Sequence, residues 1–172
     1  MREGMGIYIA LLRGINVGGT GILPMKDLAG ICKGLGLQEV RTYIQSGNVI
    51  FTSDQSEEIV RSRLETALEE RMGKKIAVMV RTPAEMRSIL SHNPFPNEDP
   101  ARVAVAFLAE QPPKDLVKKV LAPGGEKVKP GKREIYVYYP DGMGRSKLKL
   151  PLDYTAVTVR NVNTVAKLVA MT

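Results

Sequence analysis

Residues that can bind an anion are grouped in four short motifs of this 172-residue chain. In chain order the motifs read LRGINVGG, YIQSGN, GRSK and RNVNT. Backbone N–H groups of glycine-rich loops, and side chains of arginine, lysine, serine and asparagine, supply the hydrogen bonds that phosphate and carboxylate groups accept. The residue types therefore predict an anion site with donors at Arg13, Asn16, Gly18, Gly19, Ser46, Asn48, Arg145, Lys147 and Arg160.

The glycine-rich segment GINVGGTG, at residues 14–21, does not follow a recognised nucleotide-binding spacing. It matches neither the G-x-x-x-x-G-K-[ST] loop nor the G-x-G-x-x-G loop. Pro24, which is suited to open the next helix, also lacks a backbone N–H. A turn in which the glycines only give the backbone freedom to change direction is therefore the alternative interpretation.

The two later motifs have structural alternatives as well. GRSK lies in a segment rich in glycine and positive charge, and a solvated basic loop would have the same composition. In RNVNT, Asn161 or Asn163 is suited to cap the final helix, with Thr164 as a further candidate. Arg160 directly precedes that helix start, where a cation can also help to hold an anion.

Residues that usually supply nucleophiles or metal ligands are scarce. Cys32 and His92 are each the only residue of their type, which excludes an internal disulfide and a two-histidine metal site. Cys32 shares a helical face with apolar residues and is expected in the core. No spacing typical of a metal cluster or a carboxylate pair is found among Glu85, Glu98, Asp99 and Asp141. We expect no metal and no cofactor, and the sequence leaves open whether the protein is an enzyme.

The composition is that of an ordinary globular protein with a surplus of basic residues. It contains 25 Lys and Arg against 18 Asp and Glu, a net charge of +7, which favours an anionic partner. Aromatic residues make up only 5% and tryptophan is absent, so few rings could stack on nucleic-acid bases. No segment approaches the ~18 consecutive apolar residues of a membrane span. We expect a cytoplasmic protein that does not bind membranes, in agreement with its single cysteine.

Apolar periodicity and turn residues predict two successive β-α-β-β-α-β units, the order of the ferredoxin-like fold. The predicted fold class is therefore α+β, with two ferredoxin-like halves, antiparallel or mixed sheets and a C-terminal helix. Asp54 and Glu57 resemble a capping box at the start of the second helix, and Thr82 and Glu85 resemble another. The predicted boundaries are 1–81 for the first half, 82–100 for a helical connector and 101–172 for the second half.

This order of elements brings the first two motifs together. The first two strands of such a unit run in the same direction, because a right-handed crossover connects them. Their carboxyl ends therefore lie at the same edge of the sheet, so that Arg13, Asn16, Ser46 and Asn48 are expected to converge there. The segment before the fourth strand adds Lys74 to the same edge.

The ordered motifs ALLRGINVGG, RTYIQSGNVIF, NPFP, YPDGMGRSKL and RNVNT carry a family resemblance. Over essentially its whole length the sequence resembles domain of unknown function family 1697, a family of uncharacterised bacterial proteins. The resemblance implies a two-part α+β protein and no particular reaction. It gives weight to the polar motif positions, Asn161 included. Val162 stands where the family usually has tryptophan, which weighs against a stacking role for that position.

The sequence thus predicts a protein that binds an anionic small molecule, such as a nucleotide or phosphorylated metabolite, in a cleft formed by the four motifs. An RNA-binding module is the first alternative, because ferredoxin-like sheets also recognise RNA. The third strand, NVIFT, has only Phe51 where an RNA-binding sheet carries several aromatic residues. A non-catalytic scaffold or interaction protein is the second alternative.

Overall fold

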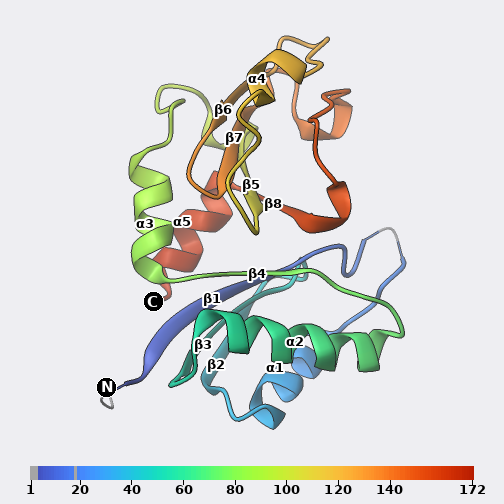
Figure 1. Cartoon of the computed structure of the whole chain (residues 1–172), viewed down its shortest axis with the longest axis vertical. Helices are drawn as coiled ribbons and strands as arrows, with labels where there is room; N and C mark the ends of the chain where they lie inside the picture. The colour runs from blue at the N-terminus through green and yellow to red at the C-terminus, as the bar shows by residue number, and fades with distance from the viewer. Residues whose placement is uncertain (1–3, 18) are drawn as a thin grey trace. The chain divides into compact units, whose positions relative to one another are not determined.

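The computed structural model describes residues 4–17 and 19–172 and divides them into two compact units (Figure 1). The first unit extends to Met86 and includes Leu168–Thr172, and the second is Arg87–Lys167. These bounds differ from the predicted ones, because the segment expected as a separate connector belongs to the units themselves. Helix α3 (Pro83–Ser91) contributes residues to both units, and the last residues of α5 (Val162–Ala170) are grouped with the first.

The first unit contains one four-stranded sheet in the order β2-β3-β1-β4, and all neighbouring strands are antiparallel. Because β1 and β2 both lie antiparallel to β3, they run in the same direction, as the predicted crossover requires. Its elements are β1 (Gly6–Leu12), α1 (Met25–Gly34), β2 (Gln38–Tyr43), β3 (Asn48–Ser53), α2 (Glu57–Met72) and β4 (Val78–Arg81).

Helices α1 and α2 cover one face of this sheet (Figure 1). Leu28 and Cys32 of α1 and Leu64 of α2 are completely buried in the core between the helices and the strands. The predicted capping box at Asp54 is wrong: α2 begins at Glu57, and Ser56 Oγ accepts the capping hydrogen bond from the Ile59 amide. The helix cap therefore lies at Ser56, two residues later than the predicted cap at Asp54.

The second unit repeats the same sheet topology, in the order β6-β7-β5-β8 with antiparallel neighbours. Its strands are β5 (Val103–Leu108), β6 (Lys127–Pro130), β7 (Glu134–Tyr138) and β8 (Val157–Asn161). Its helical elements are α4 (Leu116–Lys119), α5 and three 3-10 turns, η1 (Pro100–Arg102), η2 (Met143–Arg145) and η3 (Tyr154–Ala156). Between β7 and β8 the chain contains only the 3-10 turns η2 and η3.

The sheet of the second unit packs against a short helix, α4, and a longer one, α3. Leu116 of the four-residue helix α4 packs with Ile135 and Val137 in one cluster of buried residues. Residues of α3 reach the strand β7, since the Tyr136 hydroxyl donates to the Ile89 carbonyl at 2.8 Å. Thr82 and Glu85 form the predicted capping box at the start of α3, with hydrogen bonds of 3.1 and 3.2 Å.

The structure confirms the predicted fold class of two ferredoxin-like α+β halves with a helix at the C-terminus. Within the described part of the chain, no helix combines the length and the apolar character needed to cross a membrane.

Candidate functional site

The first two motifs meet at one edge of the first sheet, as the strand directions predicted. The loop that follows β1 and the turn that follows β2 are joined by a hydrogen bond of 2.7 Å from Asn16 Nδ2 to the Gln45 carbonyl. A second link runs from the Leu12 amide to the Gly47 carbonyl, at 2.9 Å. We refer to this region, residues 13–24 and 44–48, as the loop edge.

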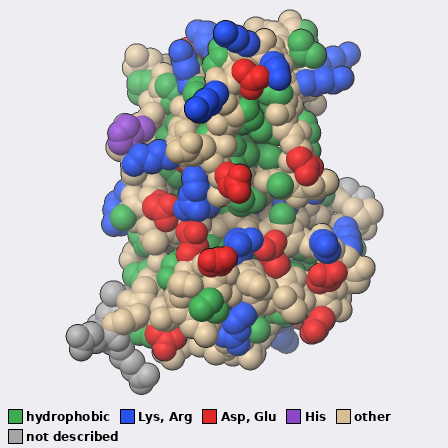
Figure 2. All heavy atoms as spheres, in the orientation of Figure 1, with side chains coloured by type: hydrophobic (Ala, Val, Ile, Leu, Met, Phe, Trp, Pro, Cys, Tyr) green, Lys and Arg blue, Asp and Glu red, His purple; other side chains and the backbone are tan. Residues whose placement is uncertain are grey.

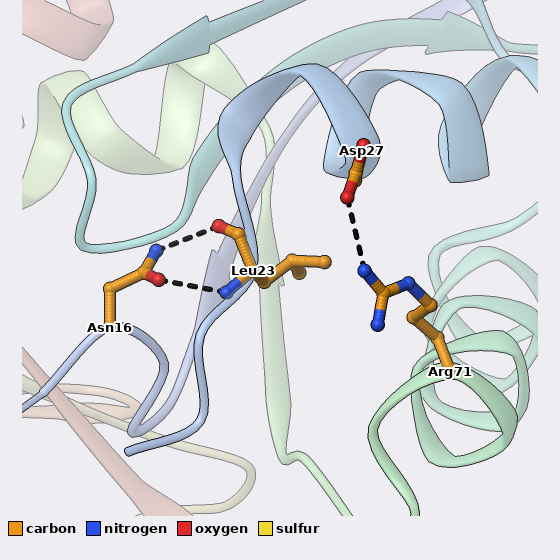
Figure 3. A network of polar contacts seen from close by, with 4 residues as sticks. All are labelled: Asn16, Leu23, Asp27 and Arg71. Atoms are coloured by element: carbon orange, nitrogen blue, oxygen red, sulfur yellow. Dashed lines mark hydrogen bonds and ion pairs between the residues drawn. The ribbon is translucent and has the colours of Figure 1, made fainter. Parts of the chain in front are cut away.

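Asn16 connects the parts of the loop edge to one another (Figure 3). Its amide donates to the Leu23 carbonyl and its Oδ1 accepts from the Leu23 N–H, both at 2.8 Å. Its backbone has a φ of 54°, in the left-handed region that asparagine adopts more readily than most residues. The donor and the acceptor of this side chain therefore both bind within the loop edge, and Asn16 acts here as a structural clamp.

The turn residues Ser46, Gly47 and Asn48 are similarly engaged within the fold. Asn48 is completely buried, and its Nδ2 donates to the Tyr43 carbonyl and to Ser46 Oγ, both at 3.0 Å. Gly47 has a φ of 87°, and a Cβ at this position would lie 2.5 Å from Ile15 Cδ1. Glycine is required here because the two loops pack against each other without space for a side chain.

The glycine loop also uses several of its own amides. The Asn16 N–H donates to the Gly21 carbonyl and the Thr20 N–H to the Val17 carbonyl, at 2.9 and 3.0 Å. Gly19 has a φ of 78° and open space around it, and Gly18 lies outside the described residues. These bonds favour a folded turn over a cradle of free amides.

Two cations remain at the loop edge. Arg13 is partly exposed, and its guanidinium forms no hydrogen bond or ion pair with a residue that the structure describes. Lys74 is exposed, and its Nζ lies 3.3 Å from the position that a Cβ on Gly21 would take. The loop edge thus has positive charge, but its asparagines are committed to the fold.

The last motif is likewise built into the second unit. Arg160 is 7% exposed and donates to Thr158 Oγ1 and the Val159 carbonyl, and burial lowers the pKa of its guanidinium to about 10. Asn161 Oδ1 accepts from the Asn163 N–H at 2.7 Å, which is the capping role that the sequence suggested for Asn161. Its amide also donates to the carbonyls of Pro100 and Ala101.

GRSK, in contrast, lines a pocket of about 210 Å³ within the second unit. Arg145 and Lys147 contribute the two positive charges, and neither side chain forms an ion pair or hydrogen bond with the described residues. We refer to this cavity as the GRSK pocket. Its complete lining is Pro123, Gly124, Glu126, Tyr139, Pro140, Asp141, Gly142, Arg145, Ser146 and Lys147.

Glu126 holds two sides of the GRSK pocket together. Its Oε1 accepts from Ser146 Oγ and its Oε2 from the Gly124 N–H, both at 2.9 Å. Backbone hydrogen bonding at Glu126 itself, with these two bonds, lowers the pKa of the carboxyl below its ordinary value, against a smaller opposing effect of burial. The pocket therefore contains an ionised carboxylate that is only 9% exposed.

Tyr139 is a buried residue in the lining of the GRSK pocket. The residue is 8% exposed, and its hydroxyl has no hydrogen-bond partner among the described residues. Burial, followed by the charges of Tyr154 and Glu126, raises the pKa of this phenol to about 12. Near neutral pH the hydroxyl consequently stays protonated and can donate a hydrogen bond to a molecule in the pocket.

Three residues of the GRSK pocket were given no binding role from the sequence, namely Glu126, Tyr139 and Asp141. Tyr139 and Asp141 belong to the motif YPDGMGRSKL, whereas Glu126 comes from the segment before β6, and no local spacing connects it with Arg145. The only signal in the sequence is the Pro-Gly-Gly turn directly before Glu126, which allows the Gly124 amide to approach the carboxylate. Among the described residues no group of three or more His, Cys, Asp or Glu side chains could hold a metal ion.

Fold and pocket together define a two-unit α+β protein with a small charged pocket in its second unit. The chain belongs to the family described as "Protein of unknown function (DUF1697)", whose model matches residues 5–136. Among solved structures it is similar to conserved bacterial protein SP0830 from Streptococcus pneumoniae, with 26% identity and a TM-score of 0.77. That match covers 97% of this chain and 98% of the other. No curated protein sequence matches the chain.

Proposed function

We propose that this protein binds an anionic small molecule, and that the anion occupies the GRSK pocket. The observation that carries the proposal is the pair of cations, Arg145 and Lys147, which line one cavity and have no partner among the described residues. The Tyr139 hydroxyl adds an uncharged donor to the same cavity. Hydrogen bonds from charged donors such as Arg145 and Lys147 are among the strongest that proteins form with phosphate or carboxylate groups.

The size of the GRSK pocket favours a small metabolite over a nucleotide. Its volume is about 210 Å³. Typical pockets for drug-sized ligands are larger, at about 300–1,000 Å³. A phosphorylated or carboxylated metabolite in the cytoplasm, where the single cysteine stays reduced, fits this description.

Thermal unfolding with monoethyl phosphate as the probe tests the proposal. At a ligand concentration about 100 times the Kd, binding to the folded protein should raise Tm by roughly 5–10 °C. Arg145→Ala and Lys147→Ala should each remove most of this shift. Lys149→Ala is the matched control, because Lys149 is an exposed lysine of the same segment that does not line the pocket.

Arg13→Ala distinguishes the GRSK pocket from the loop edge. If Arg13→Ala removes the shift and Arg145→Ala does not, the anion binds at the loop edge and the proposed location is wrong. If wild-type protein shows no shift with monoethyl phosphate, inorganic phosphate or acetate, the function itself is wrong.

Nucleic acid is a second candidate partner, because the charge is distributed unevenly. The second unit has 14 Lys and Arg against 8 Asp and Glu, which accounts for +6 of the net charge of +7. On the face drawn in Figure 2, basic side chains gather at the end of this unit where Figure 1 labels α4. Affinity for RNA that falls steeply between 50 and 200 mM salt, together with no binding of small phosphate esters, would favour this candidate.

A further inference from the structure

The GRSK pocket has charges of both signs, and this bears on which anion it can accept. Arg145 and Lys147 are positive, whereas Glu126 and Asp141 are negative, so the formal charges of the lining cancel. A purely anionic ligand would gain from the two cations and be repelled by the two carboxylates. A ligand with both a negative and a positive group would be attracted by all four.

From this we infer that the natural ligand of the GRSK pocket is zwitterionic, with a phosphate or carboxylate at Arg145 and Lys147 and an ammonium group at Glu126. The inference rests on the proposed function, since it concerns the same pocket and adds the chemical class of the ligand. Amino acids and phosphate esters of small amino alcohols belong to this class.

Glu126 is suited to receive an ammonium group. Its pKa is lowered, so it is ionised near neutral pH, and each of its two oxygens already accepts one hydrogen bond from the protein. A carboxylate has about four lone-pair sites, so acceptor capacity remains for a ligand N–H. The bonds to Ser146 and Gly124 fix the orientation of the carboxylate before the ligand arrives, which reduces the entropy lost on binding.

Tyr139 supplies a further donor to the GRSK pocket. The residue is 92% buried, but its hydroxyl differs from that of Tyr136, which donates to the Ile89 carbonyl. The Tyr139 hydroxyl has no such partner among the described residues, although the residue lines the cavity. Its hydrogen bond is therefore available to the ligand.

Calorimetric titration of wild-type protein with two matched pairs of probes tests the inference. The first pair is O-phosphoethanolamine and monoethyl phosphate, and the second is L-alanine and propionate; the members of each pair differ in the ammonium group. In at least one pair the zwitterion should bind about tenfold or more tightly than the simple anion, since a hydrogen bond to a charged group is worth about that factor.

Glu126→Gln then assigns the effect to the carboxylate. The variant keeps an acceptor oxygen for Ser146 and removes the negative charge, so it should bind the zwitterion no better than the matched anion. Tyr139→Phe, with Tyr136→Phe as its control, should weaken both members of a pair several-fold and leave their ratio unchanged. These variants are compared after circular dichroism has shown that each is folded.

The outcomes separate the inference from the proposed function. If wild-type protein binds both members of each pair equally, the ligand class is wrong and the anion site stands. If the ammonium advantage persists in Glu126→Gln, another group receives the ammonium and the inference is overturned. If no probe binds, both the inference and the proposed function fail.

Discussion

Between β3 and β4 the first half of the chain places α2, a helix of 16 residues, whereas the second half has only irregular chain and 3-10 turns between β7 and β8. The sheets themselves correspond strand for strand, in the orders β2-β3-β1-β4 and β6-β7-β5-β8. The segment that replaces α2, residues 139–156, contains most of the lining of the GRSK pocket. Loss of a covering helix thus coincides with a cavity and with charged side chains that are free to bind.

The two halves also share a short sequence repeat. V-x-V-R occurs at Val78–Arg81 and again at residues 157–160. Arg81 pairs with Ile9 of β1, and Arg160 pairs with Val105 of β5, at equivalent positions of the two sheets. Both arginines are buried, at 2% and 7% exposure, and each donates to the carbonyl of the preceding residue. The repeat therefore forms the same edge strand in each sheet, β4 in the first and β8 in the second. This equivalence favours a structural role for Arg160.

The largest predicted effect compares one glycine from each half. Gly47→Ala should destabilise the protein by about 3 kcal/mol or more, because a φ of 87° is strained for alanine and the new Cβ would overlap Ile15. Gly142→Ala, in the GRSK pocket segment, should cost about 1–3 kcal/mol, because its φ of 84° with a ψ of 154° is a conformation that almost only glycine adopts, while nothing lies within 4 Å of the new Cβ. Urea denaturation measures both. Equal losses would show that the loop edge is no more tightly packed than the pocket segment.

The next prediction compares the side-chain clamps of the two regions. Asn16→Ala removes three hydrogen bonds of the loop edge and should cost about 2–3 kcal/mol. Ser146→Ala removes the single bond from the serine hydroxyl to Glu126 and should cost about 1 kcal/mol. Thermal and urea unfolding give both values, and Asn16→Asp should destabilise at least as much as Asn16→Ala, because a carboxylate oxygen would face the carbonyls of Leu23 and Gln45. A larger loss for Ser146→Ala would reverse the comparison.

The smallest prediction concerns alkaline pH. Burial raises the pKa of the Cys32 thiol in the first half from 9.0 to about 12, whereas Tyr136 and Tyr139 in the second half are raised from 10.0 to about 12. Between the unfolded and folded pKa values the unfolded chain loses the proton and the folded protein retains it. Stability should therefore fall as pH rises, by up to about 1.4 kcal/mol per pH unit for each group.

The thiol of Cys32 has a lower pKa in the unfolded chain than the two tyrosines. As pH rises, its burial should therefore be the first to reduce the unfolding free energy, between pH 9 and 10. Cys32→Ala should flatten the decline in unfolding free energy over that interval, and Tyr139→Phe should leave it unchanged. Urea denaturation at intervals of half a pH unit measures this difference. A decline that is the same in wild type and Cys32→Ala would contradict the assigned burial of the thiol.

Much of the fold was predictable because its signals are local. The Thr82–Glu85 capping box and the cap of the final helix by Asn161 depend on residues only a few positions apart. The convergence of Asn16 with the Gln45 turn followed from strand direction alone. The start of α2 was misplaced because Asp54 and Ser56 are both good capping residues, and the exit of the chain from β3 decides between them.

By itself the sequence determined the family, the two ferredoxin-like halves and the four motifs, since each is written in contiguous residues and short spacings. Only the tertiary structure decided what the polar side chains do. It directs Asn16, Asn48 and Asn161 into hydrogen bonds of the fold and buries Arg160, while it leaves Arg145 and Lys147 in a cavity beside Glu126 and Tyr139. The physical reason is that burial depends on distant segments, and that partners such as Gln45 for Asn16 and Glu126 for Ser146 lie 29 and 20 residues away in the sequence. The packing of the sheet decides where these segments meet.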